Sequence, residues 1–425
     1  FFRDLIYIMI TNTNHHSPQQ FQGITSFIES RVLINKALLD ASADVPVVIM
    51  ANNKNERRER FNRVAIGWSL GFLSPFITLP LTNRLALKYV AKTYKNFFNK
   101  ENKIIEISNA MLKTEKSTKN AIQQMASKNN FNAEELASKC GGYENLRKKL
   151  INAKNAVLSF DFAFTAGSLG SIGYYNNYLT KKKTGRKGFS AEFNMAEKSV
   201  TDERARRYEK TASLRAASFA ALVGGLAALP IFIKKGLTNN AQKGFSGLLN
   251  KYAHKFNYDD GICMKRLPMF LALMCAYYGV SSASRNQTEL KDNLVRSTAS
   301  CAVFFGGDLI IGSTLARLSD KYLKTEILDK NAPKTLLNKL VPPTRHLKDL
   351  SGSSRKIGTG LFWINMALLS LSLGFGVPAL LNKMIKRDVE KDVNQNAPAQ
   401  NFQTVNAGLN SETFKQFMKT SLSQA

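Results

Sequence analysis

Two aspartates lie inside long apolar runs and are the side chains of this sequence best placed to do chemistry. Asp308 stands near the middle of the run 297–316, and Asp161 lies closer to one end of the run 155–180. A carboxylate at the centre of a membrane helix costs about 2.5–3.5 kcal/mol, so we expect each to face a bundle interior and to find a partner or a proton. The next cation after Asp308 is Arg317, too far along a helix to pair with it.

Two roles fit such carboxylates. One is a proton or cation relay or a polar solute site, and the other is an interhelical hydrogen bond that fixes packing. Both roles stay open for Asp308, whereas packing is the favoured role for Asp161. Asn365, in another apolar run, is a polar side chain that we expect to accompany them. Asp308, Asp161 and Asn365 are therefore the candidate residues of a substrate or ion pathway.

No pattern in the sequence is typical of an enzyme. His15, His16, His254 and His346 lie in polar segments, and none has the His-Glu-x-x-His spacing of a zinc enzyme. The cysteines form no Cys-x-x-Cys pair, so we expect neither a zinc site nor a disulfide framework. Nucleophile elbows and phosphate-binding loops are also absent from the sequence. We therefore predict a protein without enzymatic activity, cofactor or metal.

Six runs of 18 to 26 residues carry no charge or a single aspartate, and each has a lysine or arginine at both ends. The run 357–382 would extend roughly 39 Å as a helix, against a hydrocarbon core of roughly 30 Å. A large soluble bundle is the alternative, but the flanking cations favour membrane spans because they can reach the headgroups. The sequence thus predicts an all-α polytopic membrane helix bundle with about six transmembrane helices. The predicted spans are 64–83, 155–180, 216–233, 267–284, 297–316 and 357–382.

The segments around these spans are polar, and we expect amphipathic helices in them. Residues 1–63 read as a polar lead-in with an amphipathic helix, and residues 64–387 as the membrane bundle. The bundle contains a helical polar insert over 88–153, and the Asn/Gln-rich segment 388–425 is expected to be a mobile tail. Lysine and arginine are balanced between the two sides, so the positive-inside rule gives no orientation.

The chain carries a formal net charge of +29, almost all of it outside the spans. Such charge can bind nucleic acid, but beside apolar spans an anionic lipid surface is the better partner. We expect an integral, multi-pass protein of a bacterial inner membrane or an organelle membrane, with a second copy or other membrane subunits as further partners. The densest cluster, a candidate site for lipid headgroups, is Lys181, Lys182, Lys183, Arg186 and Lys187.

Two basic blocks hint at an internal repeat. ERRERFNR (56–63) and ERARRYEK (203–210) each precede an apolar run that reaches Leu-Pro, at Pro80 and Pro230. Duplication and convergence account for this pattern equally well. Glycines also cluster inside the runs, as at 167, 170 and 173, and there they are expected to let helices approach closely.

Two classes of function remain. The first is a transporter or channel-like protein for a small solute or ion, with an acidic residue inside the membrane. The second is a structural or lipid-interacting membrane protein, a scaffold or complex subunit, without transport activity. A polar cavity beside Asp308 would favour the first class, and a tightly packed bundle the second.

Overall fold

The computed structural model of the chain describes residues 24–29, 32–73, 75–90, 107–238, 243–259, 263–333 and 335–391. The start of the predicted lead-in, the part of the polar insert from 91 to 106, and nearly all of the predicted tail lie outside these residues.

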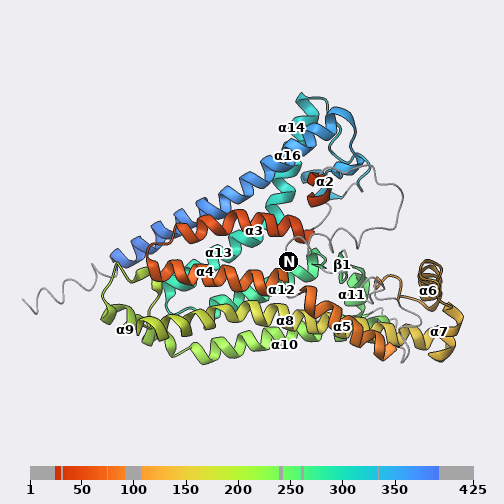
Figure 1. Cartoon of the computed structure of the whole chain (residues 1–425), viewed down its shortest axis with the longest axis horizontal. Coiled ribbons are helices and arrows are strands. Elements are labelled where there is room, and N and C mark those ends of the chain that lie inside the picture. Colours follow the sequence, from red (N-terminus) through yellow and green to blue (C-terminus); the bar gives the residue numbers. More distant parts are fainter. Residues whose placement is uncertain are drawn as a thin grey trace, which may run out of the picture.

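The described chain is all-α, as expected, apart from one short antiparallel pair formed by β1 (Tyr258–Asp259) and β2 (Cys263–Met264). Long helices run side by side along the longest axis of the molecule (Figure 1). The helices lie close together at the pole marked by α9 (Lys198–Glu209), and they spread apart at the opposite pole, one part of which is formed by α6 (Glu115–Asn129) and α7 (Ala133–Lys139). Lysine-rich segments therefore stand at both poles, while the apolar runs lie between them.

Five helices are long and apolar enough to cross a membrane, judged by length and composition. They are Lys54–Val90, Tyr143–Thr184, Ala212–Thr238, Gln287–Tyr322 and Gly352–Lys391. The first contains α4 (Lys54–Trp68), η1 (Ser69–Leu73) and α5 (Pro75–Val90); the second is α8; the third is α10; the fourth contains α13 (Gln287–Cys301), η6 (Ala302–Gly307) and α14 (Asp308–Tyr322); the fifth contains α16 (Gly352–Leu371) and η8 (Ser372–Gly376).

The predicted span 267–284 is the exception. It forms α12 (Arg266–Ser282), whose 17 residues would extend only roughly 26 Å. The helix packs against α8 and α10 inside the bundle. The structure thus supports five membrane-length helices rather than six.

The described part of the N-terminal lead-in is helical and packs on the bundle. After α2 (Ile24–Glu29), α3 (Val32–Ile49) packs against α4, α16 and η8. The helix of the first predicted span also begins earlier, at Lys54, where the Asn53 side chain accepts the backbone N–H groups of Asn55 and Glu56. Three charged residues, Lys36, Asp40 and Asp44, interrupt the apolar pattern of α3.

The remaining elements are short and lie at the two poles or in the connections. They are η4 (Ser190–Glu192), α11 (Gly244–Tyr252), η5 (Ala253–Lys255), α15 (Leu336–Leu340) and η7 (Leu347–Asp349).

The helix α8 (Tyr143–Thr184) forms the centre of the largest core. Its Leu150, Leu158 and Phe162 side chains are fully buried against α10 (Ala212–Thr238), α12 and α5. The outer faces of the bundle are apolar instead of polar: Ile77 on α5, for example, is 71 % exposed. A soluble protein rarely leaves large contiguous apolar faces uncovered, whereas a lipid environment covers them.

Gly170 and Gly173 of α8 make the close helix contacts that the sequence predicts, whereas a Cβ added to Gly167 would meet Val223 Cγ1 at an ordinary 3.8 Å. A Cβ added to Gly170 would lie 2.4 Å from the Phe219 ring of α10, and one added to Gly279 of α12 would lie 2.7 Å from the Gly170 Cα atom. A Cβ added to Gly173 would lie 2.8 Å from the Ala283 Cβ atom. The α8–α12 crossing therefore depends on the absence of side chains at these positions.

We expect Gly170→Val to destabilise the fold by about 1–3 kcal/mol, because the added methyl groups overlap the Phe219 ring. Gly224→Val is the matched control, since nothing lies within 4 Å of a Cβ at that position of α10. Thermal unfolding in detergent would compare the two. Equal stabilities would show that α8 and α12 do not depend on this contact.

Candidate binding cavity

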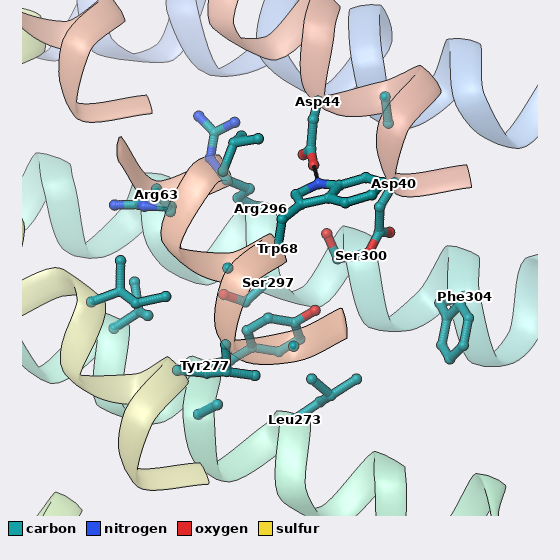
Figure 2. Close-up of a pocket in the computed structure, with 18 of the residues that line it drawn as sticks. Asp40, Asp44, Arg63, Trp68, Leu273, Tyr277, Arg296, Ser297, Ser300 and Phe304 are labelled. Atoms are coloured by element: carbon teal, nitrogen blue, oxygen red, sulfur yellow. Dashed lines mark hydrogen bonds between the residues drawn. The ribbon is translucent and has the colours of Figure 1, made fainter. Parts of the chain in front are cut away.

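A cavity of about 330 Å³ lies inside the bundle. Residues of α3, α4, η1, α8, α12 and α13 line it, so helices far apart in the sequence share its wall. The lining is mainly apolar, but it also carries carboxylates, arginines and hydroxyl groups (Figure 2). A volume of this size is typical of sites for small molecules.

The α3 side of the cavity carries a stripe of charged side chains. Lys36, Asp40 and Asp44 recur every fourth residue, so they share one face of the helix. Lys36 pairs with Asp40 and lies over the Phe304 ring, with its Nζ atom 4.7 Å from the ring centroid. The Nε1–H group of Trp68 donates a 2.9 Å hydrogen bond to Asp44 Oδ2. Within the described part of the chain, Asp44 forms no ion pair.

Two arginines, Arg63 of α4 and Arg296 of α13, face the cavity from other helices (Figure 2). Arg63 Nη1 donates to Asn293 Oδ1 at 3.2 Å, and Arg296 Nη2 donates to Asp292 Oδ1 at 3.1 Å. The Nε atom of each arginine is buried and has no hydrogen-bond partner in the described structure. Unused donors of this kind are costly inside a protein, and they mark a place that a ligand or water can fill.

Three helices that line the cavity change to π-helical geometry beside it. Gly71 and Phe72 of η1, Phe304 of η6 and Leu373 of η8 all belong to the lining. A π-helical turn inserts one extra residue into an α-helix, and such turns are often found at functional sites.

Two of these π-helical turns have similar sequences, and this similarity was not among the repeats predicted from the sequence. SLGFLSP (69–75) and SLGFGVP (372–378) have five residues of seven in common, and each ends at a proline. Their helices run in opposite directions through the bundle (Figure 1). This similarity differs from the expected repeat of blocks 56–63 and 203–210, which remains a prediction.

A buried ion-pair network closes the cavity towards the α9 pole. The Arg285 guanidinium donates to both Glu59 oxygens at 2.9 Å and to Glu289 Oε1 at 2.8 Å. Ser190 Oγ donates to Glu59 Oε2 at 2.6 Å, and the Thr180 hydroxyl also donates to Glu59. Burial alone would lower the pKa of Arg285, but the Glu289 and Glu59 carboxylates raise it, so the guanidinium stays charged.

A second buried carboxylate, Glu192, secures the loop at the same pole. Its Oε2 atom accepts a hydrogen bond from Arg204 Nη1 at 3.1 Å, and Asn286 Nδ2 donates to both of its oxygens. Asn53, which caps α4, donates at 2.7 Å to the backbone oxygen of Ser190. The segment between α8 and α9 is therefore tied to α4 and to the start of α13.

Of the three pathway residues predicted from the sequence, the structure places Asp161 beside the cavity. It is buried and accepts a 3.0 Å hydrogen bond from Tyr258 Oη and a longer one, 3.4 Å, from Thr165 Oγ1. Asn365 is buried between α16 and α14, where its Nδ2 atom would lie 3.6 Å from a Cβ at Gly312. Asp308 begins α14, and its side chain lies outside what the structure describes. The three are not brought together at one described site.

The predicted lipid-binding cluster divides into two groups. Lys181, Lys182 and Lys183 are exposed on the last turn of α8. Arg186 is committed internally, because it donates to the backbone oxygens of Phe193 and Ala196 and to Thr201 Oγ1. Lys187 pairs with Glu209 at 3.1 Å. The free positive charge of this cluster is thus concentrated on the three lysines.

Apart from Asp161, the sequence did not identify the charged residues that line the cavity. Arg63 and Arg296 stand at the ends of predicted spans, where we expected their side chains to reach the lipid headgroups; instead they face inwards. The four-residue spacing of Lys36, Asp40 and Asp44 was a visible signal that α3 presents one charged face. No group of three His, Cys, Asp or Glu residues among those described is arranged to hold a metal ion.

Comparison with known proteins adds no relative: no family model, curated protein or solved structure matches the chain.

Removing the cation from the buried network should cost more stability than removing any surface pair. We expect Arg285→Gln to destabilise the fold by about 3–5 kcal/mol, because the Glu59 and Glu289 carboxylates stay buried without it. Arg207→Gln is the control, since its pair with Glu203 is exposed. Thermal unfolding of both variants in detergent checks this. An Arg285→Gln protein as stable as the control would contradict it.

The two groups of the basic cluster should respond differently to neutralisation. Replacing Lys181, Lys182 and Lys183 by Gln should weaken binding to anionic vesicles and leave the unfolding temperature unchanged, because these side chains are exposed. Arg186→Gln should do the reverse, because it breaks contacts that hold the 186–201 loop. Vesicle co-sedimentation at rising salt, with neutral vesicles as the control, measures the first effect. Unchanged binding by the triple variant would exclude this lysine group as a lipid contact.

Proposed function

We propose that this chain is a multi-pass integral membrane protein that binds a small solute in its internal cavity and carries it across the membrane. The observation that carries the proposal is the charged lining of the cavity, enclosed by helices of membrane length. Apolar packing alone would hold such a bundle together more cheaply than buried charges do. Buried charges that serve no packing need are therefore best explained by a solute that uses them.

The state of those charges supports a site more than a scaffold. Asp44 and Arg63 each line the cavity without an ion-pair partner in the described part of the chain. A structural bundle would pair such groups with each other or replace them. The π-helical turns at the cavity wall add backbone segments that can rearrange while the flanking helices stay intact.

The alternative is a structural or lipid-interacting membrane protein, a scaffold or complex subunit that transports nothing. The exposed lysines at the end of α8 would suit that role as well as the first. The two proposals differ in whether the cavity opens to water. A transporter must open its site to each side in turn, whereas a scaffold keeps such a void closed.

Cysteine accessibility tests this without knowledge of the solute. In a variant whose native cysteines are serine, Ser300→Cys places a thiol on the cavity wall. In reconstituted vesicles we expect a membrane-impermeant maleimide to modify it both from outside and from the lumen. Ala166→Cys, a fully buried position outside the lining, should stay protected. Ser199→Cys, exposed on α9, should react from one side only and so reports the orientation.

Two results would contradict transport. A Ser300→Cys thiol that reacts from neither side belongs to a closed void and favours the structural alternative. A thiol that reacts from one side alone belongs to a binding pocket that does not pass its ligand across.

A further inference from the structure

We infer that the cavity takes a small organic anion, whose carboxylate or phosphate group binds between Arg63 and Arg296. This inference deepens the proposed function and rests on it in one respect, namely that the bound anion is the solute carried. The binding itself follows from the two arginines, the hydroxyl groups near them and the apolar wall beyond.

The arginines hold donors in reserve that suit an oxyanion. Arg63 uses Nη1 on the neutral amide of Asn293, and Arg296 uses Nη2 on Asp292. The Nε–H group of each is buried and unpartnered in the described structure. A guanidinium presents Nε–H and an Nη–H as a fork that matches two oxygens of a carboxylate or phosphate. Two guanidinium groups on the wall of one cavity define an anion site more closely than a single cation would.

Hydroxyl groups stand on the same wall. Ser297 follows Arg296 directly and Ser300 lies one helical turn further along α13; both line the cavity. Figure 2 shows both serines between the arginines and the far end of the cavity. Such hydroxyls can donate to the remaining oxygens of an anion.

The carboxylates around the cavity do not make it a cation site. Asp40 pairs with Lys36, Glu56 with Arg60, and Glu59 with Arg285. Asp292 pairs with Arg296, and it leaves the Nε group of that arginine unused. Asp44 accepts a hydrogen bond from Trp68, and Asp161 accepts hydrogen bonds from Tyr258 and Thr165. Among the described residues of the lining, the fully buried side-chain donors without a hydrogen-bond partner are Arg63 Nε and Arg296 Nε.

The rest of the cavity suits the apolar body of such an anion. Trp68, Leu273 and Phe304 line it, and Figure 2 shows Phe304 at the side away from the arginines. A ligand lying along this direction would place its charged group at Arg63 and Arg296 and an aliphatic or aromatic part against these side chains. The cavity of about 330 Å³ accommodates a molecule of about the size of an aromatic acid.

Thermal unfolding of the full chain in detergent tests the inference with matched ligands. Benzoate and phenyl phosphate carry the two oxyanions on the same ring, and benzylammonium carries a cation on it. We expect benzoate or phenyl phosphate to raise the unfolding temperature in a saturable manner, because a ligand of the folded state stabilises it. The anion that gives the larger rise in unfolding temperature shows whether a carboxylate or a phosphate is the preferred group. Benzylammonium should give no such shift.

Variants assign the effect to the arginines. Arg63→Gln and Arg296→Gln should each weaken the apparent affinity at least tenfold, whereas Arg57→Gln, exposed on the same helix as Arg63, should retain it. Arg63→Lys serves where the Gln variant does not fold, because it keeps the charge and removes the fork; it too should weaken binding.

A saturable shift that persists in the Arg63→Gln and Arg296→Gln double variant, or no shift with either anion, would overturn the inference. The labelling of Ser300→Cys tests transport independently of the anion-induced shift. Two-sided labelling of Ser300→Cys without an anion shift leaves transport standing and removes the anion. An anion shift without two-sided labelling leaves the anion site standing and removes transport.

Discussion

The bundle depends on one buried carboxylate. Glu59 accepts hydrogen bonds from Arg285, Thr180 and Ser190, so that one side chain joins α4 to α8, to η4 and to the turn between α12 and α13. A charge buried this deeply persists only if its lone pairs are used, and here both oxygens are shared by several donors. The network fixes the rotation of α4 about its axis. Arg63 lies one turn further along the same face, so the same constraint turns it towards the cavity.

The position of α3 follows from the same requirement. A helix that carries Lys36, Asp40 and Asp44 on one face cannot turn that face to lipid. Its other contacts are apolar: Leu39 packs with Met366 and Leu369 of α16. Within the bundle the charged face meets Trp68, Phe304 and the polar groups of the cavity. The cavity is therefore the place where the polar sides of several largely apolar helices meet.

The sequence predicted an all-α fold, because long runs without charge are typical of helices that bury or shield apolar side chains. Each predicted span proved helical. It could not predict which cations face inwards. Arg63 and Arg285 both end predicted spans, and a sequence pattern gives the position of such a residue along a helix but not the neighbour it meets. It predicted an amphipathic helix in the segment that contains α3, but it did not predict that Lys36, Asp40 and Asp44 of this helix line a cavity. Asp161 was identified because a lone carboxylate in an apolar run is costly unless it is buried beside a hydrogen-bond donor.

The length of α8 has a mechanical consequence. Its 42 residues would extend roughly 63 Å without a π-helical turn, about twice the thickness of a hydrocarbon core, so in the proposed membrane arrangement the helix would extend into water at one or both ends. Of the helices that pack against it, the one formed by α4, η1 and α5 contains a π-helical turn beside the cavity. Because α8 is helical without interruption, a displacement of its end at α6 and α7 would be transmitted along the helix to the segment before α9. In the proposed membrane-spanning arrangement, α8 would therefore link the two sides of the bilayer mechanically, in addition to any solute passage.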